Sequence, residues 1–281
     1  MMTPPPRRFA FTSIAGFAIA TLCIVGGLLM ENGQLHDVEQ VTAALIVFGG
    51  TTGAILVSTP NPALFSALSR IRQLIWEETE DSQAMIDEMI RHSRKARASG
   101  ILSLDSEIDE IGEPFLRKGM MLLVDGVEAV EIRRVMDLDL ILSENHAEGD
   151  AKVFETAAGL APTIGIIGAV MGLIQVMKHL ENLSDVGHGI ATAFVATVYG
   201  VALANLILLP IASRIRVRAL QTSRFRELIV EGVLGIQAGT NPGLMGRMLS
   251  GFAEGHNSAK TPVMDKAGDV PPANVPEVGR A

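Results

Sequence analysis

Residues 161–177 read APTIGIIGAVMGLIQVM, an uncharged stretch that holds one proline and three glycines. In a water-exposed helix this composition is unfavourable, because each glycine costs about 1 kcal/mol and the proline about 3 kcal/mol relative to alanine. Glutamates stand on both sides of the stretch, at Glu155 and Glu181. The stretch therefore predicts a helix that lies in lipid, where small residues let helices approach closely.

Three more uncharged stretches accompany the one around residues 157–177, at 9–30, 41–59 and 190–212. Each is roughly 20 residues long, which is the length a helix needs to cross a bilayer. The first is longer than the apolar core of a signal peptide, which spans about 7 to 15 residues, so we expect it to be retained. Only 19% of the 281 residues are charged, below the proportion usual in soluble domains. The sequence predicts an all-α integral membrane protein with four transmembrane helices and a large cytoplasmic helical domain.

The domain organisation follows from these stretches. Residues 1–59 carry the first two membrane helices, 60–153 form the cytoplasmic helical domain, and 154–212 carry the other two membrane helices. Apolar residues spaced three and four apart over 66–99 predict an amphipathic helix, with breaks at Gly100 and around Pro114. Residues 213–249 predict a cytoplasmic amphipathic helix, and the Pro-, Ala- and Gly-rich segment 250–281 predicts a disordered tail.

Positive residues near the ends of the stretches predict the orientation. The segments 31–40 and 178–189 contain a single positive residue, Lys178. The other positive residues near the membrane all fall on the opposite side: Arg7, Arg8, Arg70, Arg72, Lys152, Arg214, Arg216 and Arg218. Because cytoplasmic loops carry the excess of Lys and Arg, both termini are expected in the cytoplasm.

Several function classes find no support in the sequence. It contains no P-loop, no G-x-S-x-G, H-E-x-x-H or CxxC motif and no dinucleotide fingerprint, so we expect neither an enzyme nor a cofactor. Six scattered histidines lack the spacing of metal ligands. A net charge of −8 disfavours nucleic acid as a partner. None of the four stretches contains Asp, Glu, Lys, Arg or His. Either the protein moves no ions, or a partner supplies the titrating carboxylate.

The third and fourth stretches carry stripes of small residues. The stripes repeat every four residues, as Ala161, Gly165 and Ala169 in one and Thr192, Ala196, Gly200 and Ala204 in the other. They predict either ordinary packing inside one bundle, or a surface facing another helix or a water-filled space, with Thr197 and Asn205 as polar lining. Pro162 and Pro210 are expected at equivalent heights, and each removes a backbone donor and creates a possible point of flexure.

These residues carry a family resemblance. Residues 161–177, followed by GIATAFVATVYGVALANLILLPIASRI at 189–215, resemble the third and fourth membrane helices of MotA-type flagellar stator subunits. ARASGILSLDSEI at 96–108 and EPFLRKGMMLLVDG at 113–126 resemble their cytoplasmic loop. The resemblance covers about residues 10–245. The wider group includes ExbB and TolQ proteins, which have a three-span plan where this chain has four.

The resemblance implies an assembly. In MotA-like proteins about five copies form a homo-oligomer around two copies of a single-span MotB-like partner, whose aspartate binds the ion. This arrangement would explain why the four stretches lack a carboxylate. By the same resemblance, Pro162 and Pro210 match the paired prolines that couple ion passage to movement of the cytoplasmic part.

The resemblance also implies a contact with a FliG-like rotor switch protein. Arg97 and Asp105 match the charged rotor-contact residues of the family, although Asp105 replaces a glutamate and reaches less far. Glu107 and Lys95 are neighbours that could share this role. From the residues alone, Arg97 and Asp105 would instead be interpreted as part of a solvated helix face.

Three positions in the third and fourth stretches indicate which ion the protein moves. Sodium-driven relatives carry threonine at the positions that match Ala169 and Ala196, beside the threonine that matches Thr197. Sodium needs several oxygens to replace its hydration, whereas a proton needs one carboxylate and a chain of waters. The expected ion is therefore the proton. Two alternative functions remain open, an ExbB/TolQ-like energiser of outer-membrane processes and a passive membrane scaffold without an ion role.

Overall fold

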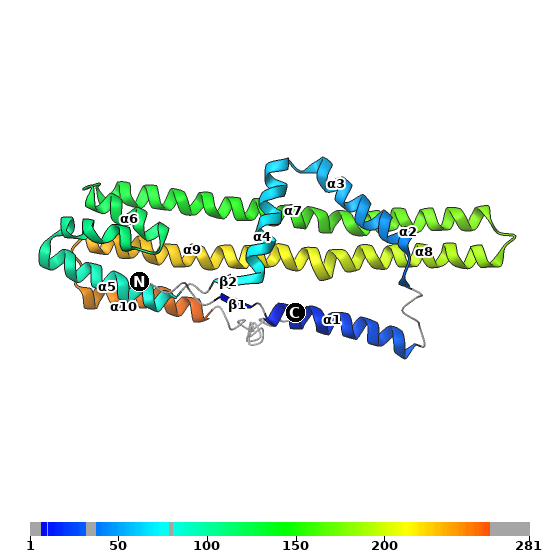
Figure 1. Cartoon of the computed structure of the whole chain (residues 1–281), viewed down its shortest axis with the longest axis horizontal. Coiled ribbons are helices and arrows are strands. Elements are labelled where there is room, and N and C mark those ends of the chain that lie inside the picture. The colour runs from blue at the N-terminus through cyan, green and yellow to red at the C-terminus, as the bar shows by residue number, and fades with distance from the viewer. Residues whose placement is uncertain (1–6, 10, 32–37, 79–80, 259–281) are drawn as a thin grey trace, which may run out of the picture.

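Two very long antiparallel helical rods organise the molecule (Figure 1). The computed structural model describes residues 7–9, 11–31, 38–78 and 81–258. The first rod is α7, Ala129–Lys178, a helix of 50 residues and so about 75 Å long. The second rod consists of α8 (Leu183–Ala202), the π-helical segment η4 (Leu203–Leu208) and α9 (Leu209–Gln237), which follow one another without a loop.

Several of the remaining elements pack along these rods. The second uncharged stretch forms α2 (Val41–Ala44), the π-helical segment η2 (Leu45–Gly49) and α3 (Gly50–Ser58). The others, in chain order, are β1 (Arg7–Phe9), α1 (Phe11–Met30), α4 (Asn61–Ile75), β2 (Trp76–Glu78), α5 (Ser82–Ser99), the 3-10 helix η3 (Ile101–Glu110), α6 (Pro114–Val124) and α10 (Pro242–Ser258). β1 and β2 pair antiparallel, and they are the strands found in the described ranges, so the architecture is helical as predicted.

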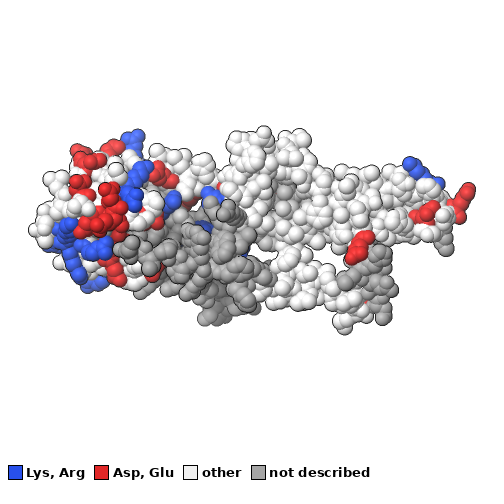
Figure 2. Space-filling model, in the orientation of Figure 1, with Lys and Arg blue, Asp and Glu red and all other residues white. Residues whose placement is uncertain are grey.

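The long apolar helices account for the hydrophobic composition. Within the described residues, three helical stretches are long and apolar enough to cross a membrane: Val41–Ser58, Ala129–Lys178 and Ser184–Gln237. A shorter apolar stretch, Ala15–Met30, lies in α1, and its Leu22 side chain is 70% exposed. Figure 2 shows charged residues gathered at the end of the molecule that holds α5 and α6 and near the far tip, with an uncharged band between them.

The charged end holds the largest core, which we call the distal core. It joins α5, η3, α6, α9, α10 and the N-terminal half of α7, and its fully buried members include Met89, Leu116 and Ile132. Two glycines make room for methionines. A Cβ added to Gly232 would lie 2.8 Å from the Met89 sulfur, and one added to Gly119 would lie 2.8 Å from the Met136 terminal methyl.

The structure corrects the helix predicted over residues 66–99. The chain leaves the helical conformation after Ile75 and re-enters it at Ser82. The Asp81 carboxylate caps the new helix by accepting from the backbone N–H groups of Gln83 and Ala84, both at 3.0 Å, which satisfies donors that a helix start leaves without partners. The predicted breaks at Gly100, which has a φ of 83°, and at Pro114, the first residue of α6, are confirmed.

The structure also places several predicted boundaries inside helices. The limits at 153/154 and 212/213 fall within α7 and α9, which continue through them. The helix predicted over 213–249 is interrupted near Gly239, whose φ is 65°. The predicted tail 250–281 starts within α10, because buried Met245 and Leu249 dock this helix on the distal core. Residues 259–281 lie outside the described residues.

Candidate functional site

The small-residue stripes of α7 and α8 face each other within one chain. A Cβ added to Gly165 would lie 2.9 Å from the Ala196 carbonyl oxygen, and one added to Gly200 would lie 2.6 Å from the Ala161 carbonyl oxygen. The two helix backbones are therefore in direct contact along what we call the glycine seam, formed by Ala161, Gly165, Gly168 and Gly172 of α7 with Gly189, Ala193, Ala196 and Gly200 of α8. Of the two interpretations of the stripes, packing inside the bundle is the one that the seam residues follow.

The three predicted ion-pathway residues divide between two surroundings. Ala169 and Thr197 are half-buried, and each follows a seam residue by one position. Because a helix turns about 100° per residue and the two helices are antiparallel, both fall on the same flank of the seam. Ala196 has no exposed surface and packs with Ala43 and Val47 of the second uncharged stretch. The structure thus brings Ala169 and Thr197 together on an open flank, while Ala196 is enclosed.

The prolines lie at different heights, which corrects the prediction that they sit level. Gly200 contacts the Pro162 region, since a Cβ added to Gly200 would lie 3.1 Å from the Pro162 Cα. Pro210 follows Gly200 by about ten residues, or roughly 15 Å of helix. It therefore lies opposite the part of α7 near Ala151, closer to the charged end. The sequence could not reveal this offset because it gives no register between the helices.

The two prolines also have different local structures. Pro162 lies inside α7, where its missing N–H leaves one helical hydrogen bond unmade. Pro210 is in the first turn of α9, directly after the π-helical segment Leu203–Leu208. A wider turn before a proline relieves the clash between its ring and the preceding carbonyl groups. Each rod thus has one proline that disturbs its regular helical hydrogen bonding, and the two prolines lie at different heights along the rods.

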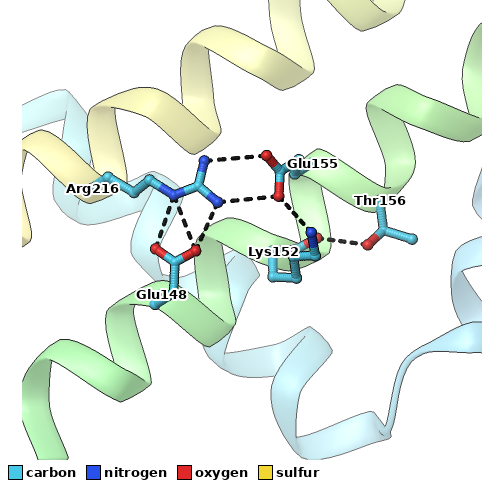
Figure 3. A network of polar contacts seen from close by, with 5 residues as sticks. All are labelled: Glu148, Lys152, Glu155, Thr156 and Arg216. Atoms are coloured by element: carbon cyan, nitrogen blue, oxygen red, sulfur yellow. Dashed lines mark hydrogen bonds and ion pairs between the residues drawn. The ribbon is translucent and has the colours of Figure 1, made fainter.

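An ion network joins the two rods between the glycine seam and the charged end of the molecule (Figure 3). The guanidinium of Arg216 on α9 forms a fork with Glu148 of α7, at 2.9 Å from Nε to Oε2 and 2.7 Å from Nη2 to Oε1. It also donates to Glu155 at 3.1 Å from Nη2 to Oε2, and Lys152 donates to the same oxygen at 2.8 Å. One arginine therefore links two glutamates that are two turns apart on α7.

This network changes the titration of its members. Hydrogen bonds from Arg216 and Lys152 lower the pKa of the Glu155 carboxyl from 4.5 to about 2. The hydrogen bond from Arg216 also lowers the pKa of Glu148, and the hydrogen bonds to both glutamates raise the pKa of Arg216. Glu148, Glu155 and Arg216 are thus all charged at neutral pH. Sequence reasoning used Arg216 only for orientation and missed Glu148 and Glu155, because pairing across the rods depends on their register.

The predicted rotor-contact residues lie at the tip of the distal core. Arg97 is in the last turn of α5 and Asp105 is in η3, and both are exposed. Within the described ranges neither side chain makes an ion pair. The turn between them depends on Gly100, while buried Leu104 and Ile108 anchor η3 on the core. The geometry therefore presents both charges to solvent from a firmly packed segment.

Glu107 differs from these two residues because it has partners in its own chain. Its carboxylate accepts from Lys95 Nζ at 2.8 Å and lies 3.2 Å from Nδ1 of His92, whose side chain is 1% exposed. The hydrogen bond from Lys95 lowers the pKa of Glu107. Glu107 thus ties η3 to α5, so its structural contacts compete with a role in contacting another protein.

The fold and these sites define a helical membrane protein in which two continuous rods connect an uncharged glycine seam to a charged domain. The MotA/TolQ/ExbB proton channel family matches residues 107–227, and the motility protein A N-terminal family matches residues 14–99. The uncharacterized protein YtxD of Bacillus subtilis is 32% identical over 94% of this chain and 98% of its own length. Motility protein A of the same organism is 30% identical over 82% of this chain and 86% of its own length.

A comparison with solved structures points to the same kind of protein. The flagellar MotAB stator complex from Bacillus subtilis contains a chain that matches with a TM-score of 0.82 and 28% identity, over 89% of this chain and 98% of that one. The chain belongs to the MotA/TolQ/ExbB proton channel family and is a MotA-type flagellar stator subunit.

Proposed function

We propose that this chain works with a MotB-like single-span partner to couple inward proton flow to torque on the flagellar rotor. The observation that carries the proposal is the flank of the glycine seam, where half-buried Ala169 and Thr197 fall on the same side and the predicted spans contain no Asp, Glu, Lys, Arg or His. A proton pathway needs a titrating group at membrane depth. The partner's aspartate supplies it, and the relatives solved as MotAB complexes provide the precedent for that partner.

The proposed membrane arrangement uses four spans. They are α1, the segment α2 to α3, the C-terminal part of α7, and α8 with η4. The distal core lies in the cytoplasm, both termini are cytoplasmic, and the membrane is the bacterial inner membrane. The positive residues near the helix ends support this orientation.

Coupling in this proposal runs through the rods. Charging the partner's aspartate in a low-dielectric interface shifts the preferred helix arrangement, because a buried ion is costly without compensation. One charge that moves through 100 mV supplies about 2.3 kcal/mol. Pro162 and Pro210 are the points of flexure, and α7 and α9 carry the movement to the distal core. Arg97 and Asp105 then contact a FliG-like rotor protein, with Glu107 in a supporting position.

Copy number and ion choice complete the proposal. The chain forms a homo-oligomer, a pentamer, around the partner, as the family resemblance implies. Alanine at positions 169 and 196 leaves few oxygens to replace the hydration of sodium. Enclosed Ala196 contributes by shaping the seam, while Ala169 and Thr197 line the pathway. The chain itself is not an enzyme and needs no cofactor.

The test measures rotation of tethered cells that carry this chain and its partner as the sole stator. We expect rotation to stop when the proton gradient is collapsed, even with a sodium gradient imposed. Cells that lack the single-span partner serve as the control and should not rotate. Sustained rotation on sodium alone would overturn the proton assignment, and rotation without the partner would overturn the coupling.

An ExbB/TolQ-like energiser is the other ion-driven candidate. The match of residues 14–99 to the motility protein A N-terminal family favours the stator instead. The same cells test the third candidate, a passive scaffold. If the chain were only a scaffold, cells from which it is deleted would still rotate.

A further inference from the structure

A polar pocket of about 480 Å³ opens where α4 crosses the two rods on their cytoplasmic side. One stripe from each of α4, α7 and α9 lines it, and three arginines, Arg70, Arg218 and Arg226, converge there. Hydroxyl groups of serines and a threonine supply most of the other polar lining, and Glu144 supplies one carboxylate. The four ionisable side chains of the lining thus carry a formal charge of +2.

Two of the three arginines, Arg70 and Arg226, are held in place by contacts beside the pocket. Arg70 donates from Nε to Oδ2 of buried Asp150 at 2.8 Å. Arg226 donates from Nη1 to the Ser143 hydroxyl at 3.0 Å, and its guanidinium lies 5.3 Å from the centre of the Phe115 ring. Each guanidinium has five N–H donors in a planar fork, which suits bidentate recognition of phosphate oxygens. The guanidinium groups of Arg70 and Arg226 are therefore positioned before a ligand arrives.

The faces of α4 show from which side a ligand reaches the pocket. Ala67 is buried, and together with Leu64 and Ile71 it packs α4 on the rods. Phe65 and Leu68 are 71% and 51% exposed on one flank of this packing face. The pocket residues Ser66, Ser69 and Arg70 lie on the opposite flank. An exposed apolar flank suits lipid, so the pocket opens away from the bilayer and toward water.

We propose that the polar pocket binds the phosphate group of a small water-soluble phosphorylated anion. Three arginine forks and neighbouring hydroxyls provide charge-assisted and neutral hydrogen bonds of the kind that phosphate oxygens accept. Glu144 opposes this binding by its charge, and its carboxylate accepts a hydrogen bond from the Ser223 hydroxyl. A phosphate bound there would link α4 to both rods on the cytoplasmic side of the seam.

The test uses the full-length complex with its partner in phosphatidylcholine nanodiscs and measures binding of inorganic phosphate by calorimetry. Arg226→Gln should weaken binding about tenfold, since a hydrogen bond to a charged group is lost. Its partner Ser143 is neutral, so this change leaves no buried charge unpaired. Glu144→Gln should tighten binding several-fold, a gain that a misfolded protein could not produce. Arg134→Gln is the matched control, because exposed Arg134 is not part of the pocket lining and pairs with Glu131 on the protein surface.

Three outcomes would overturn the proposal. They are the absence of phosphate binding at millimolar concentration, binding that Arg226→Gln and Glu144→Gln leave unchanged, and binding that Arg134→Gln weakens equally. A parallel measurement replaces part of the phosphatidylcholine with phosphatidylglycerol. Unchanged phosphate binding supports the water-soluble source, whereas competition would make the lipid headgroup the occupant and overturn the assignment of the source.

Discussion

The two halves of the rod pair are packed by opposite means. Along the glycine seam the backbones of α7 and α8 touch, and glycines and alanines fill the interface. In the distal core the same rods are held together by large side chains such as Met136 and Ile229, both completely buried. In water, burial of large apolar groups drives association. In lipid that drive is absent, so close approach of backbones replaces it.

The difference has a mechanical consequence. Interlocked side chains resist movement, because a packed core tolerates few changes of arrangement. A seam of small residues has fewer interlocking groups. The rods therefore combine a half held by backbone contacts between small residues with a half held by interlocked large side chains.

The largest effect is expected from a single methyl group added to the seam. Gly200→Ala places a Cβ 2.6 Å from the Ala161 carbonyl oxygen, which forces the rods apart and costs about 1–3 kcal/mol. Gly187→Ala on the same helix is the matched control, since no atom lies within 4 Å of its added Cβ. The measurement is the thermal unfolding midpoint of the purified complex. Equal midpoints for the two variants would show that the seam is not in contact.

Replacing the proline in the seam half should separate torque from stability. Pro162→Ala restores a helical N–H donor and stiffens α7, so we expect rotation to be abolished while membrane insertion and the unfolding midpoint are maintained. Pro210→Ala should act in the same direction. Pro242→Ala is the control, because α10 begins at Pro242 after a turn, whereas Pro210 lies within the unbroken rod formed by α8, η4 and α9. Normal motility in both rod variants would contradict the role of flexure.

Charge reversals at the distal tip should affect torque and leave stability unchanged. Arg97 and Asp105 are exposed, so Arg97→Glu and Asp105→Lys should each change the free energy of unfolding by less than about 0.5 kcal/mol and still reduce rotation. Glu107→Gln is the contrasting variant, because loss of its ion pair with Lys95 should lower stability by up to about 1 kcal/mol. The comparison is made by tethered-cell rotation and thermal unfolding. A reversal that destabilises the protein more than Glu107→Gln does would contradict this division of roles.

The smallest expected effect is a pH-dependent change in stability from the Arg216 network, which lies where the two halves of the rod pair meet. The Glu155 pKa is about 2 in the folded chain against 4.5 without its partners. A lowered pKa gives stability that is present above pH 4.5 and is lost as the pH falls from there toward 2. We therefore expect Glu155→Gln to be less stable than the unaltered protein at pH 7, with a difference that shrinks over this window. Unfolding midpoints measured between pH 7 and 3 provide the check, and a constant difference would exclude the network as its source.

Much of this architecture could be predicted from local sequence patterns. The uncharged stretch 161–177, the break at Gly100 and the start of a helix at Pro114 each depend on residues close together in the chain. The split between α4 and α5 was missed, because the apolar spacing continues across Asp81 although its side chain caps a new helix. The sequence placed the start of the tail at residue 250, although α10 continues beyond it. This was missed because few apolar residues, such as Leu249, hold α10 on the distal core.

The sequence by itself determined the helical architecture and the long apolar stretches, and it left two possibilities for ion movement, either none or a carboxylate supplied by another chain. Composition and periodicity are sufficient for these conclusions, because hydrophobic length and helical repeat are local properties. Only the tertiary structure decided that the stripes face each other, that Pro162 and Pro210 lie at different heights, that Ala196 is enclosed, and that Arg216 joins Glu148 and Glu155. These features depend on the register between α7 and the rod from α8 to α9, and that register is fixed by the contacts of the glycine seam.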